Sequence, residues 1–189
     1  MTDSPAQGVL ADRTALITGA ASGIGFAMVR AFLAAGARVA VVDRDSEALA
    51  EASKELEKPG EALFLEADVT DEGAFVRCFD AAEGAFGWVD VLVNNAGISG
   101  PVAPVEEMDA AAWRETLEIN LTAPALWSGE YVRRYRRRGS KEGVILITAS
   151  TLGKRPLVNR AAYCTSKLGL IALTRVLATE LGPSGVRVN

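Results

Sequence analysis

The sequence predicts an α/β fold in which helices cover both faces of one parallel, doubly wound β-sheet. Short runs rich in β-branched residues alternate with longer segments rich in alanine, leucine and glutamate. The short runs are apolar at successive positions, which is typical of strands buried on both faces. Such alternation favours a parallel sheet with right-handed helical crossovers. No linker, repeat or low-complexity tract interrupts it, so we expect a single three-layer α/β/α domain over residues 1–189.

Five runs are expected to form strands, and five segments are expected to form the helices. The strands are predicted at 14–18, 38–43, 62–68, 89–95 and 143–150, and the helices at about 23–36, 45–57, 71–86, 107–138 and 160–182. The final letters VRVN read as the opening of a sixth strand, so the chain is expected to stop inside a strand.

Composition excludes several classes of protein. With 49% hydrophobic residues, 23% charged residues and a net charge of −4, the chain fits a soluble globular protein and not a general nucleic-acid binder. The N-terminus does not resemble a signal peptide, and the apolar runs are too short to span a membrane. With no histidine and only two cysteines, Cys78 and Cys164, no metal site is expected. Both thiols are expected to be reduced, in a cytoplasmic protein.

One basic run departs from this acidic balance. Five arginines fall between Arg133 and Arg138, just before Gly139. Cations at the end of a helix complement its dipole, and runs of charge usually mark solvated faces. We expect a solvated helix end here, with contact to nucleic acid or another anionic surface as the alternative.

A glycine-rich turn follows the first strand. Gly19, Gly23 and Gly25 have the spacing GxxxGxG, and glycines let backbone N–H groups approach a pyrophosphate closely. The helix that begins near Gly23 would direct its positive end at the same group. Ser22 and Thr18 could add hydroxyl hydrogen bonds. The pattern predicts a dinucleotide site, although a ligand-free strand-to-helix turn has the same spacing.

An acidic residue at the end of the second strand supports this interpretation. Asp43 lies 24 residues after Gly19, where a carboxylate can accept hydrogen bonds from both hydroxyls of an adenosine ribose. It would repel a 2′-phosphate and so favours NAD over NADP. Arg44 keeps NADP open, because an arginine there can pair with that phosphate. Asp43 could instead cap the next helix, but Asp45 or Ser46 could do the same.

The ends of the third and fourth strands are expected to complete the nucleotide site. Asp68 and Val69 could flank the adenine through a hydrogen bond and an apolar contact. The motif NNAG, Asn94 to Gly97, offers small residues and backbone amides close to the cofactor. Ligands of open α/β sheets lie beyond the carboxyl ends of the strands, where these segments converge.

The chemistry is expected to depend on Tyr163 and Lys167. Residues four apart lie on one face of a helix, so the ammonium can lie near the phenol. At about 4 Å and an effective dielectric constant of about 20, a cation stabilises a phenolate by about 4 kcal/mol. A tyrosinate is then a plausible general base in a chain without histidine. A tyrosine and a lysine four residues apart also occur on many ordinary helices.

Two further residues could act beside this pair. Ser150, at the end of the fifth strand, could hold a substrate oxygen beside the phenol, and Thr148 is a weaker rival. Asn120 lies within the long helix predicted at 107–138, and asparagine is a poor helix former. Its side chain could bond a neighbouring carbonyl, bend the helix, or hold a water that relays protons to Lys167.

The order of these motifs resembles that of the short-chain dehydrogenase/reductase family over essentially the whole chain. TGAASGIG resembles the family's TGxxxGIG motif, NNAG matches its fourth-strand motif, and its catalytic set would fall on Asn120, Ser150, Tyr163 and Lys167. The resemblance implies a Rossmann fold, a nicotinamide cofactor, and reversible oxidation of an alcohol to a carbonyl. The residues expected to contact the cofactor are Gly19, Ser22, Gly23, Ile24, Gly25, Asp43, Arg44, Asp68, Val69, Asn95, Ala96, Gly97, Tyr163 and Lys167.

The sequence departs from the family pattern in two places. The fifth strand reads ITAS where family members commonly have two adjacent serines, although Ser150 keeps its position. Family chains also continue past VRVN with a Pro-Gly segment, a mobile substrate loop and a last strand, which this chain is expected to lack. The resemblance further implies a small-molecule substrate and a homodimer or homotetramer.

Three functions remain open at this point. The first is NAD-dependent interconversion of a secondary alcohol and a ketone. The second is an NADPH-dependent carbonyl reductase, such as a 3-oxoacyl reductase. The third is a non-catalytic dinucleotide-binding subunit. The expected substrate wall is mostly apolar and suggests a non-ionic substrate; it comprises Ile98, Val102, Leu152, Leu157 and Val158.

Overall fold

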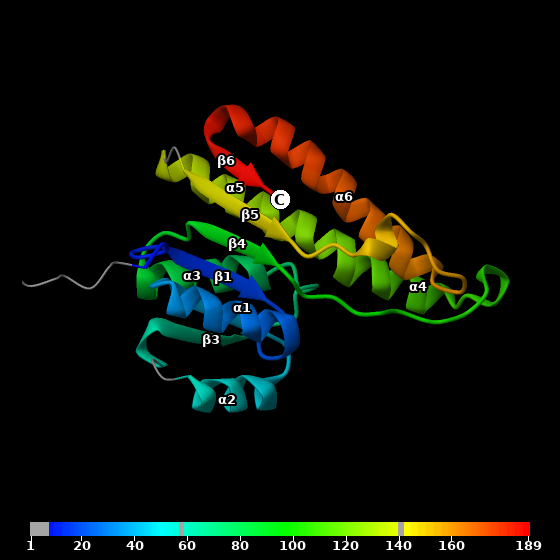
Figure 1. Cartoon of the computed structure of the whole chain (residues 1–189), viewed down its shortest axis with the longest axis horizontal. Helices are drawn as coiled ribbons and strands as arrows, with labels where there is room; N and C mark the ends of the chain where they lie inside the picture. The colour runs from blue at the N-terminus through cyan, green and yellow to red at the C-terminus, as the bar shows by residue number, and fades with distance from the viewer. Residues whose placement is uncertain (1–7, 57–58, 140–141) are drawn as a thin grey trace, which may run out of the picture.

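The structure is a computed structural model that describes residues 8–56, 59–139 and 142–189 (Figure 1). The strands are β1 (Thr14–Thr18), β2 (Arg38–Asp43), β3 (Ala62–Glu66), β4 (Val91–Asn94), β5 (Gly143–Ile147) and β6 (Val186–Val188). The α-helices are α1 (Gly23–Ala34), α2 (Ser46–Glu55), α3 (Ala74–Phe86), α4 (Ala110–Leu117), α5 (Ala123–Arg138) and α6 (Ala161–Leu181).

The strands form one six-stranded sheet in the order β3-β2-β1-β4-β5-β6. Every neighbouring pair is parallel. The order runs outward in both directions from the adjacent strands β1 and β4, so the predicted doubly wound topology is confirmed. The sixth strand expected from VRVN is present as β6, next to β5.

Different helices cover the two faces of the sheet, and α1 lies in front of the sheet in Figure 1 with α5 behind it. One buried cluster joins alternate strand residues to α3, α5 and α6, with Phe79, Trp127 and Leu170 among its largest members. The other joins the opposite strand faces to α1 and α2, through Val29, Leu33 and Leu49. Burial on both faces explains why the strands are apolar at successive positions.

The segment predicted as one helix over 107–138 is divided in the structure. One turn of π-helix, Glu118–Thr122, separates α4 from α5, and the N–H of Ala123 bonds a carbonyl five residues back. Pro124 has no N–H to offer to an α-helical ladder, which favours a break at this place. The break puts Asn120 in the wide turn, where it is fully buried.

Three strands end earlier than predicted at their carboxyl ends. β3 ends at Glu66 instead of residue 68, β4 at Asn94 instead of 95, and β5 at Ile147 instead of 150. The residues that follow these ends form loops over the edge of the sheet. These loops are the ones expected to carry the ligand site.

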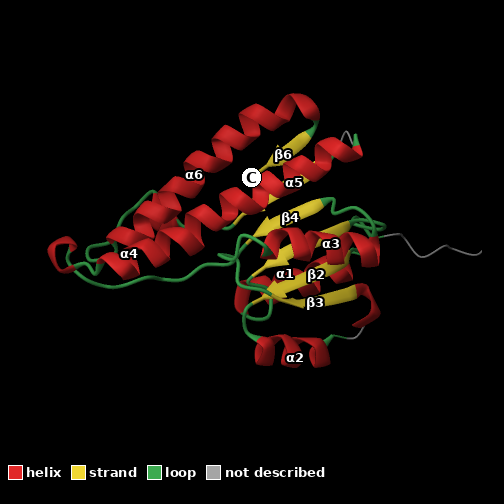
Figure 2. Ribbon diagram, turned by 180° about the vertical axis from the view of Figure 1, so that it is seen from behind, coloured by secondary structure: helices red, strands yellow, loops and turns green. Residues whose placement is uncertain are grey.

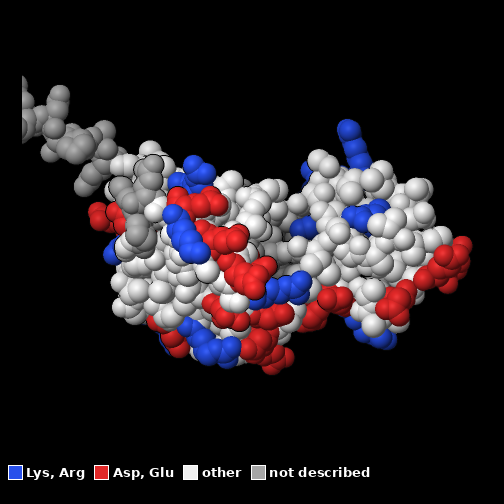
Figure 3. Space-filling view, turned by 90° about the horizontal axis from the view of Figure 1, so that it is seen from below, with Lys and Arg blue, Asp and Glu red and all other residues white. Residues whose placement is uncertain are grey.

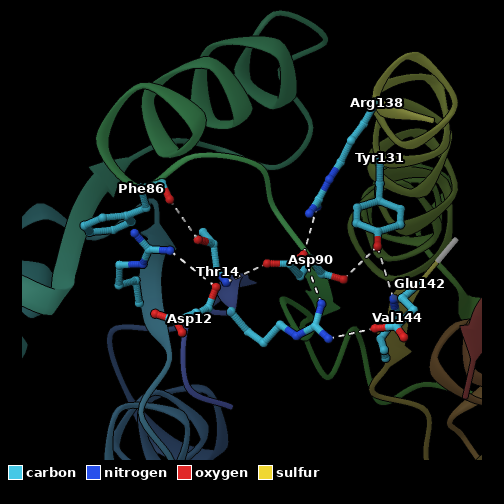
Figure 4. A network of polar contacts seen from close by, with 10 residues as sticks. Asp12, Thr14, Phe86, Asp90, Tyr131, Arg138, Glu142 and Val144 are labelled. Carbon is cyan, nitrogen blue, oxygen red and sulfur yellow. Dashed lines mark hydrogen bonds and ion pairs between the residues drawn. The ribbon is translucent and has the colours of Figure 1, made fainter. Parts of the chain in front are cut away.

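At the opposite edge, the amino ends of the strands are joined by a buried carboxylate (Figure 4). Asp90 accepts hydrogen bonds from the Thr14 amide at 3.0 Å and from the Arg138 guanidinium at 2.8 Å. The Tyr131 hydroxyl donates to the Asp90 carbonyl at 2.7 Å. Asp90 therefore ties β1 and β4 to α5 with nearly all of its polar atoms satisfied, which compensates for its burial.

The prediction of a solvated helix end at 133–138 is wrong for Arg134. Arg134 is only 6% exposed. Its guanidinium lies 2.7 Å from Asp80, 2.8 Å from Glu83 and 2.7 Å from Glu130. It therefore joins α5 to α3 through Asp80 and Glu83 and pairs with Glu130 within α5, whereas Arg136 and Arg137 are exposed as expected.

Glu130→Gln is expected to destabilise the fold in a pH-dependent way. Burial acts to raise the pKa of Glu130, but hydrogen bonds from Arg133 and Arg134 outweigh it, so the pKa lies below its ordinary value. A carboxylate with a lowered pKa stabilises the fold above its ordinary pKa and loses this effect as the pH falls through the lowered value. We expect Glu130→Gln to reduce the free energy of unfolding by about 2–3 kcal/mol at neutral pH.

Urea unfolding between pH 3 and pH 7, read out by circular dichroism, measures this effect. The deficit of Glu130→Gln should shrink below about pH 4.5, the ordinary pKa of the group. Glu180→Gln, at an exposed position of α6, is the matched control and should change stability little. A deficit that is the same at every pH would contradict the role given to the Glu130 charge.

Candidate functional site

A cavity of about 240 Å³ opens beyond the carboxyl ends of β1, β2, β3 and β4. Its lining comprises Gly19, Ser22, Asp43, Arg44, Ala67, Asp68, Val69, Asn95, Ala96, Gly97, Ile98 and Ile119. Nine of these are residues that the sequence analysis assigns to a cofactor. Gly23, Ile24, Gly25, Tyr163 and Lys167 are not in the lining. The space-filling view shows the surface hollowed between the sheet with its helices and the lobe formed around α4 and α6 (Figure 3).

Close backbone packing shapes the glycine turn. Gly19 and Gly23 have φ of +59° and +54°, in the left-handed region that favours glycine. A Cβ on Gly19 would lie 2.7 Å from the Cα of Ala96, and a Cβ on Gly25 would lie 2.7 Å from the Asn95 Nδ2. The turn therefore packs directly against the NNAG loop. Ser22 precedes α1 without a side-chain hydrogen bond to it, so the first N–H groups of this helix lack a side-chain cap and suit an anion.

Thr18 does not take the role expected for it beside the phosphates. Thr18 is 2% exposed, and its hydroxyl accepts hydrogen bonds from the amides of Asn95 at 3.1 Å and Ala96 at 3.2 Å. The Asn95 side chain donates to the carbonyls of Thr18 at 3.1 Å and Gly19 at 2.8 Å. These bonds join the ends of β1 and β4 and hold the floor of the cavity.

The two acidic residues in the lining already hold parts of the backbone. Asp43 accepts from the amides of Ala21 at 3.0 Å and Asp45 at 3.2 Å, while Asp45 itself caps α2. Asp43 is therefore not the helix cap. Hydrogen bonds from the Thr70 amide and hydroxyl lower the pKa of Asp68. Each carboxylate has four acceptor positions, so both keep capacity for a ligand.

Lys167 is a buried ammonium held by one backbone carbonyl. It is 4% exposed, and its Nζ donates to the Thr148 carbonyl at 2.8 Å. Burial lowers its pKa from the ordinary value, because the charged form loses hydration. The Nζ lies 5.7 Å from the centre of the Tyr163 ring, so the pair expected one helical turn apart is brought together.

Asn120 acts as a clamp between two segments. Its Oδ1 accepts from the Ile98 amide at 2.8 Å, and its Nδ2 donates to the Ile98 carbonyl at 2.9 Å and to the Ser166 hydroxyl at 3.1 Å. These bonds fix the loop after β4 to α6. A Cβ on Gly97 would lie 3.1 Å from the Asn120 Oδ1 and 3.5 Å from the Lys167 Nζ, so both atoms border the same space.

Ser150 lies three residues beyond the end of β5 and begins a short 3-10 turn, Thr151–Gly153. Its Oγ accepts from the Leu152 amide at 3.2 Å, which leaves the hydroxyl hydrogen available to a substrate oxygen. The rival Thr148 donates its hydroxyl to the Asn95 Oδ1 at 3.2 Å. Thr148 is therefore engaged within the protein, and Ser150 remains the candidate.

A larger cavity of about 440 Å³ lies at the amino edge of the sheet, near Asp90. Among its charged residues, Arg13 pairs with Glu142 at 2.7 Å and with Asp90 at 3.5 Å. No residue of its described lining was assigned to a cofactor or to catalysis. We therefore place the candidate site at the carboxyl edge, in the smaller cavity.

Comparison with known proteins identifies the family. The family model described as short chain dehydrogenase matches residues 13–189. The chain belongs to the short-chain dehydrogenase family. The cis-4-hydroxycyclohexanecarboxylate dehydrogenase of Sinomonas cyclohexanicum is 42% identical over 180 residues, which are 95% of this chain and 71% of that protein. This short-chain dehydrogenase is therefore an oxidoreductase.

Two solved structures resemble this short-chain dehydrogenase closely. NAD+-bound xylitol dehydrogenase superposes with a TM-score of 0.90 at 35% identity, over 96% of this chain and 69% of the other. A 3-ketoacyl-(acyl-carrier-protein) reductase from Brucella melitensis, complexed with NADH, superposes with a TM-score of 0.89 at 35% identity, over 95% and 73%. The Rossmann-type fold is thereby confirmed, and a nicotinamide dinucleotide is supported as the cofactor.

Four residues near the site escaped the sequence analysis or were given another role. Ala67 and Ile119 line the cavity, and each directly adjoins a residue that was assigned, Asp68 or Asn120. Ile98 was expected in the substrate wall but also lines the nucleotide cavity. Arg160 has its guanidinium carbon 5.3 Å from the centre of the Tyr163 ring. Its position three residues before Tyr163, at the start of the helix predicted at 160–182, was a signal that could have revealed it.

Gly19→Ala and Gly23→Ala form a matched test of the glycine turn. Both positions have positive φ, so an alanine at either should destabilise the fold by about 1–2 kcal/mol. Only at Gly19 would the new Cβ also meet the Ala96 backbone, because the space beside Gly23 is open. Gly19→Ala should therefore be less stable than Gly23→Ala and should weaken NAD binding at least about tenfold. Urea unfolding and calorimetric titration measure the two effects, and equal stability of both variants would contradict this packing.

Proposed function

We propose that this short-chain dehydrogenase interconverts a secondary alcohol and a ketone with NAD(H), and that Tyr163 transfers the proton. The observation that carries the proposal is the buried ammonium of Lys167, held by the Thr148 carbonyl at 2.8 Å and 5.7 Å from the centre of the Tyr163 ring. A nearby opposite charge favours the ionised form of a group in general, and this is the role proposed for Lys167 toward a Tyr163 phenolate. General acid–base catalysis of this kind contributes typically about 10²–10⁴-fold to the rate.

The residues of the cavity fit a dinucleotide. Gly19 and Gly25 leave no room for side chains, so backbone amides can approach a pyrophosphate, which would lie at the N-terminus of α1. Asp43 would accept from the adenosine ribose, and Asp68 and Val69 would flank the adenine. When bound, the nicotinamide supplies the hydride acceptor or donor.

The remaining residues orient the substrate and move the proton. Ser150 would donate its hydroxyl hydrogen to the substrate oxygen and hold it beside Tyr163. In oxidation the phenolate takes the alcohol proton, and in reduction the phenol returns it. Lys167 would stabilise the phenolate and contact the nicotinamide ribose. Asn120 would fix the position of Ile98 relative to α6. Its Oδ1 borders the same space as the Lys167 Nζ, and a water in this space would relay the proton.

Tyr163→Phe is expected to lower kcat at least about 100-fold, because it removes the proton carrier. The Kd for NAD should change no more than a few-fold. Stopped-flow hydride transfer and calorimetry measure the two quantities. Tyr135→Phe is the matched control, because that hydroxyl donates to the Ser184 carbonyl elsewhere in the fold. If Tyr163→Phe kept turnover within a few-fold of the native rate, the assignment of the proton carrier would fail.

NAD is favoured over NADP because Asp43 lines the cavity. Asp43→Ala should weaken NAD binding at least about tenfold, by the loss of hydrogen bonds to a charged group. NADP binding should weaken less, because repulsion of the 2′-phosphate is also removed. Asp45→Ala, which removes the helix cap but no ribose contact, is the control for backbone effects. If Asp43→Ala weakened both cofactors equally, Asp43 would not select the cofactor.

Two alternative functions remain. A 3-oxoacyl or other carbonyl reductase using NADPH is favoured by the likeness to the 3-ketoacyl reductase from Brucella melitensis, although that structure is complexed with NADH. Relative dissociation constants of NADH and NADPH decide between the two cofactors. A non-catalytic dinucleotide-binding subunit would bind NAD by calorimetry but turn over neither alcohols nor ketones.

We further propose that the protein is a cytoplasmic homodimer or homotetramer and forms a single domain. Helix α6 supports self-association, because Leu168 and Val176 are 55% and 52% exposed on it. Large exposed apolar side chains at helical spacing often mark contacts between proteins. Sedimentation equilibrium measures the state of association. Within the described ranges, no helix is both long enough and apolar enough to cross a membrane.

A further inference from the structure

Arg160 lies beside the proposed proton carrier. It precedes α6 by one residue, and its guanidinium carbon is 5.3 Å from the centre of the Tyr163 ring. Lys167, four residues after Tyr163, lies 5.7 Å from the same centre. The tyrosine ring is therefore in contact with two cations. Of these two, only Lys167 is fully buried within the protein. Arg160 is only partly buried.

The backbone before Arg160 is fixed in an uncommon conformation. Asn159 has φ of +61°, a left-handed value that asparagine tolerates better than most residues. Its carbonyl accepts from the Ala103 amide at 3.0 Å. This bond joins the loop after β4 to the loop before α6, and in Figures 1 and 2 both loops extend past the sheet beside α4. Arg160 thus stands where the two loops meet.

Arg160 differs in its partners from the buried Arg134 and the half-buried Arg138. Arg134 and Arg138 are paired with carboxylates at 2.7 to 2.8 Å. Across the described residues, no acidic side chain forms an ion pair with Arg160. A guanidinium that lies over a ring still has N–H groups that can bind a planar carboxylate.

The charge around Arg160 favours an anion. The chain has no acidic residue from 143 to 179, and this stretch carries five cations: Lys154, Arg155, Arg160, Lys167 and Arg175. The acidic residues of the loop after β4 are Glu106, Glu107 and Asp109, which are all exposed, and Asp109 caps α4. Figure 3 shows isolated basic side chains among uncharged ones on the lobe that carries these loops, with acidic side chains along its margin.

The same loops expose large apolar side chains. Val102, Leu157 and Val158 are 68%, 58% and 86% exposed. A ligand between the two loops would therefore meet apolar groups together with the Arg160 guanidinium. One guanidinium neutralises one negative charge, which suits a carboxylate better than a doubly charged phosphate.

We propose that Arg160 binds a carboxylate of the substrate, and that the substrate is a hydroxy or keto acid with an apolar body. This inference rests on the proposed function, because it takes Tyr163 as the place where the alcohol reacts. It replaces the expectation of a non-ionic substrate, which considered the apolar wall residues without Arg160. The carboxylate lies at the end of the molecule away from the reacting carbon, so that the guanidinium and the phenol hold the two ends.

Equilibrium binding tests the proposal without turnover. Cyclohexanecarboxylate and cyclohexanecarboxamide, which have nearly the same shape, are titrated into the protein saturated with NAD, for the native protein, Arg160→Gln and Arg155→Gln. The native protein should bind the carboxylate at least about tenfold more tightly than the carboxamide. Arg160→Gln should lose at least about tenfold for the carboxylate and less than about threefold for the carboxamide. Arg155→Gln, at an exposed position of the same loop, should match the native protein.

Two results would overturn the proposal. One is equal binding of the acid and the amide by the native protein, including no binding of either. The other is a loss in Arg160→Gln that is equal for both ligands, which would make Arg160 a support for the Tyr163 ring. Failure of the proposed function is seen separately, as absence of NAD binding or as undiminished turnover of Tyr163→Phe.

Discussion

The buried ammonium of Lys167 is the interaction on which the arrangement of the site depends. A charge taken out of water must be held by close polar groups, and here the Thr148 carbonyl accepts from it at 2.8 Å. That bond requires α6 to lie directly against the loop after β5. Gly153 makes this approach possible, because a Cβ there would lie 2.8 Å from the Lys167 carbonyl oxygen. The position of Tyr163 then follows from one turn of helix.

The parallel sheet brings the rest of the site to the same edge. β1, β2, β3 and β4 all end there, and side chains at or just after these ends hold neighbouring backbone segments together. Thr18, Asn95 and Asp43 each bond backbone groups of a neighbouring segment. No side chain caps the first N–H groups of α1. This edge of the sheet therefore suits a negatively charged ligand.

Much of this could be predicted from the sequence, because the signals were local. The glycine spacing, Asp43 after a strand and the Tyr163–Lys167 spacing each depend on a few neighbouring residues and the period of one element. The long helix at 107–138 was predicted without its π-turn, because the way in which a proline such as Pro124 changes the hydrogen bonds of a helix depends on packing. Thr18 and Arg134 were misassigned because their partners are distant in the sequence. The Thr18 hydroxyl bonds the Val93 carbonyl, 75 residues away, and the Arg134 guanidinium bonds Glu83, 51 residues away.

The Asp90 network has a consequence for how the protein can change. It lies at the amino edge of the sheet, so the full length of β1 and β4 separates it from the cavity at the carboxyl edge. The Asp90 network and the residues that line the cavity are thus drawn from opposite ends of β1 and β4. Substitutions that raise thermal tolerance can therefore be sought around Asp90 and Tyr131 without the loss of activity that accompanies rigidity near a reacting centre.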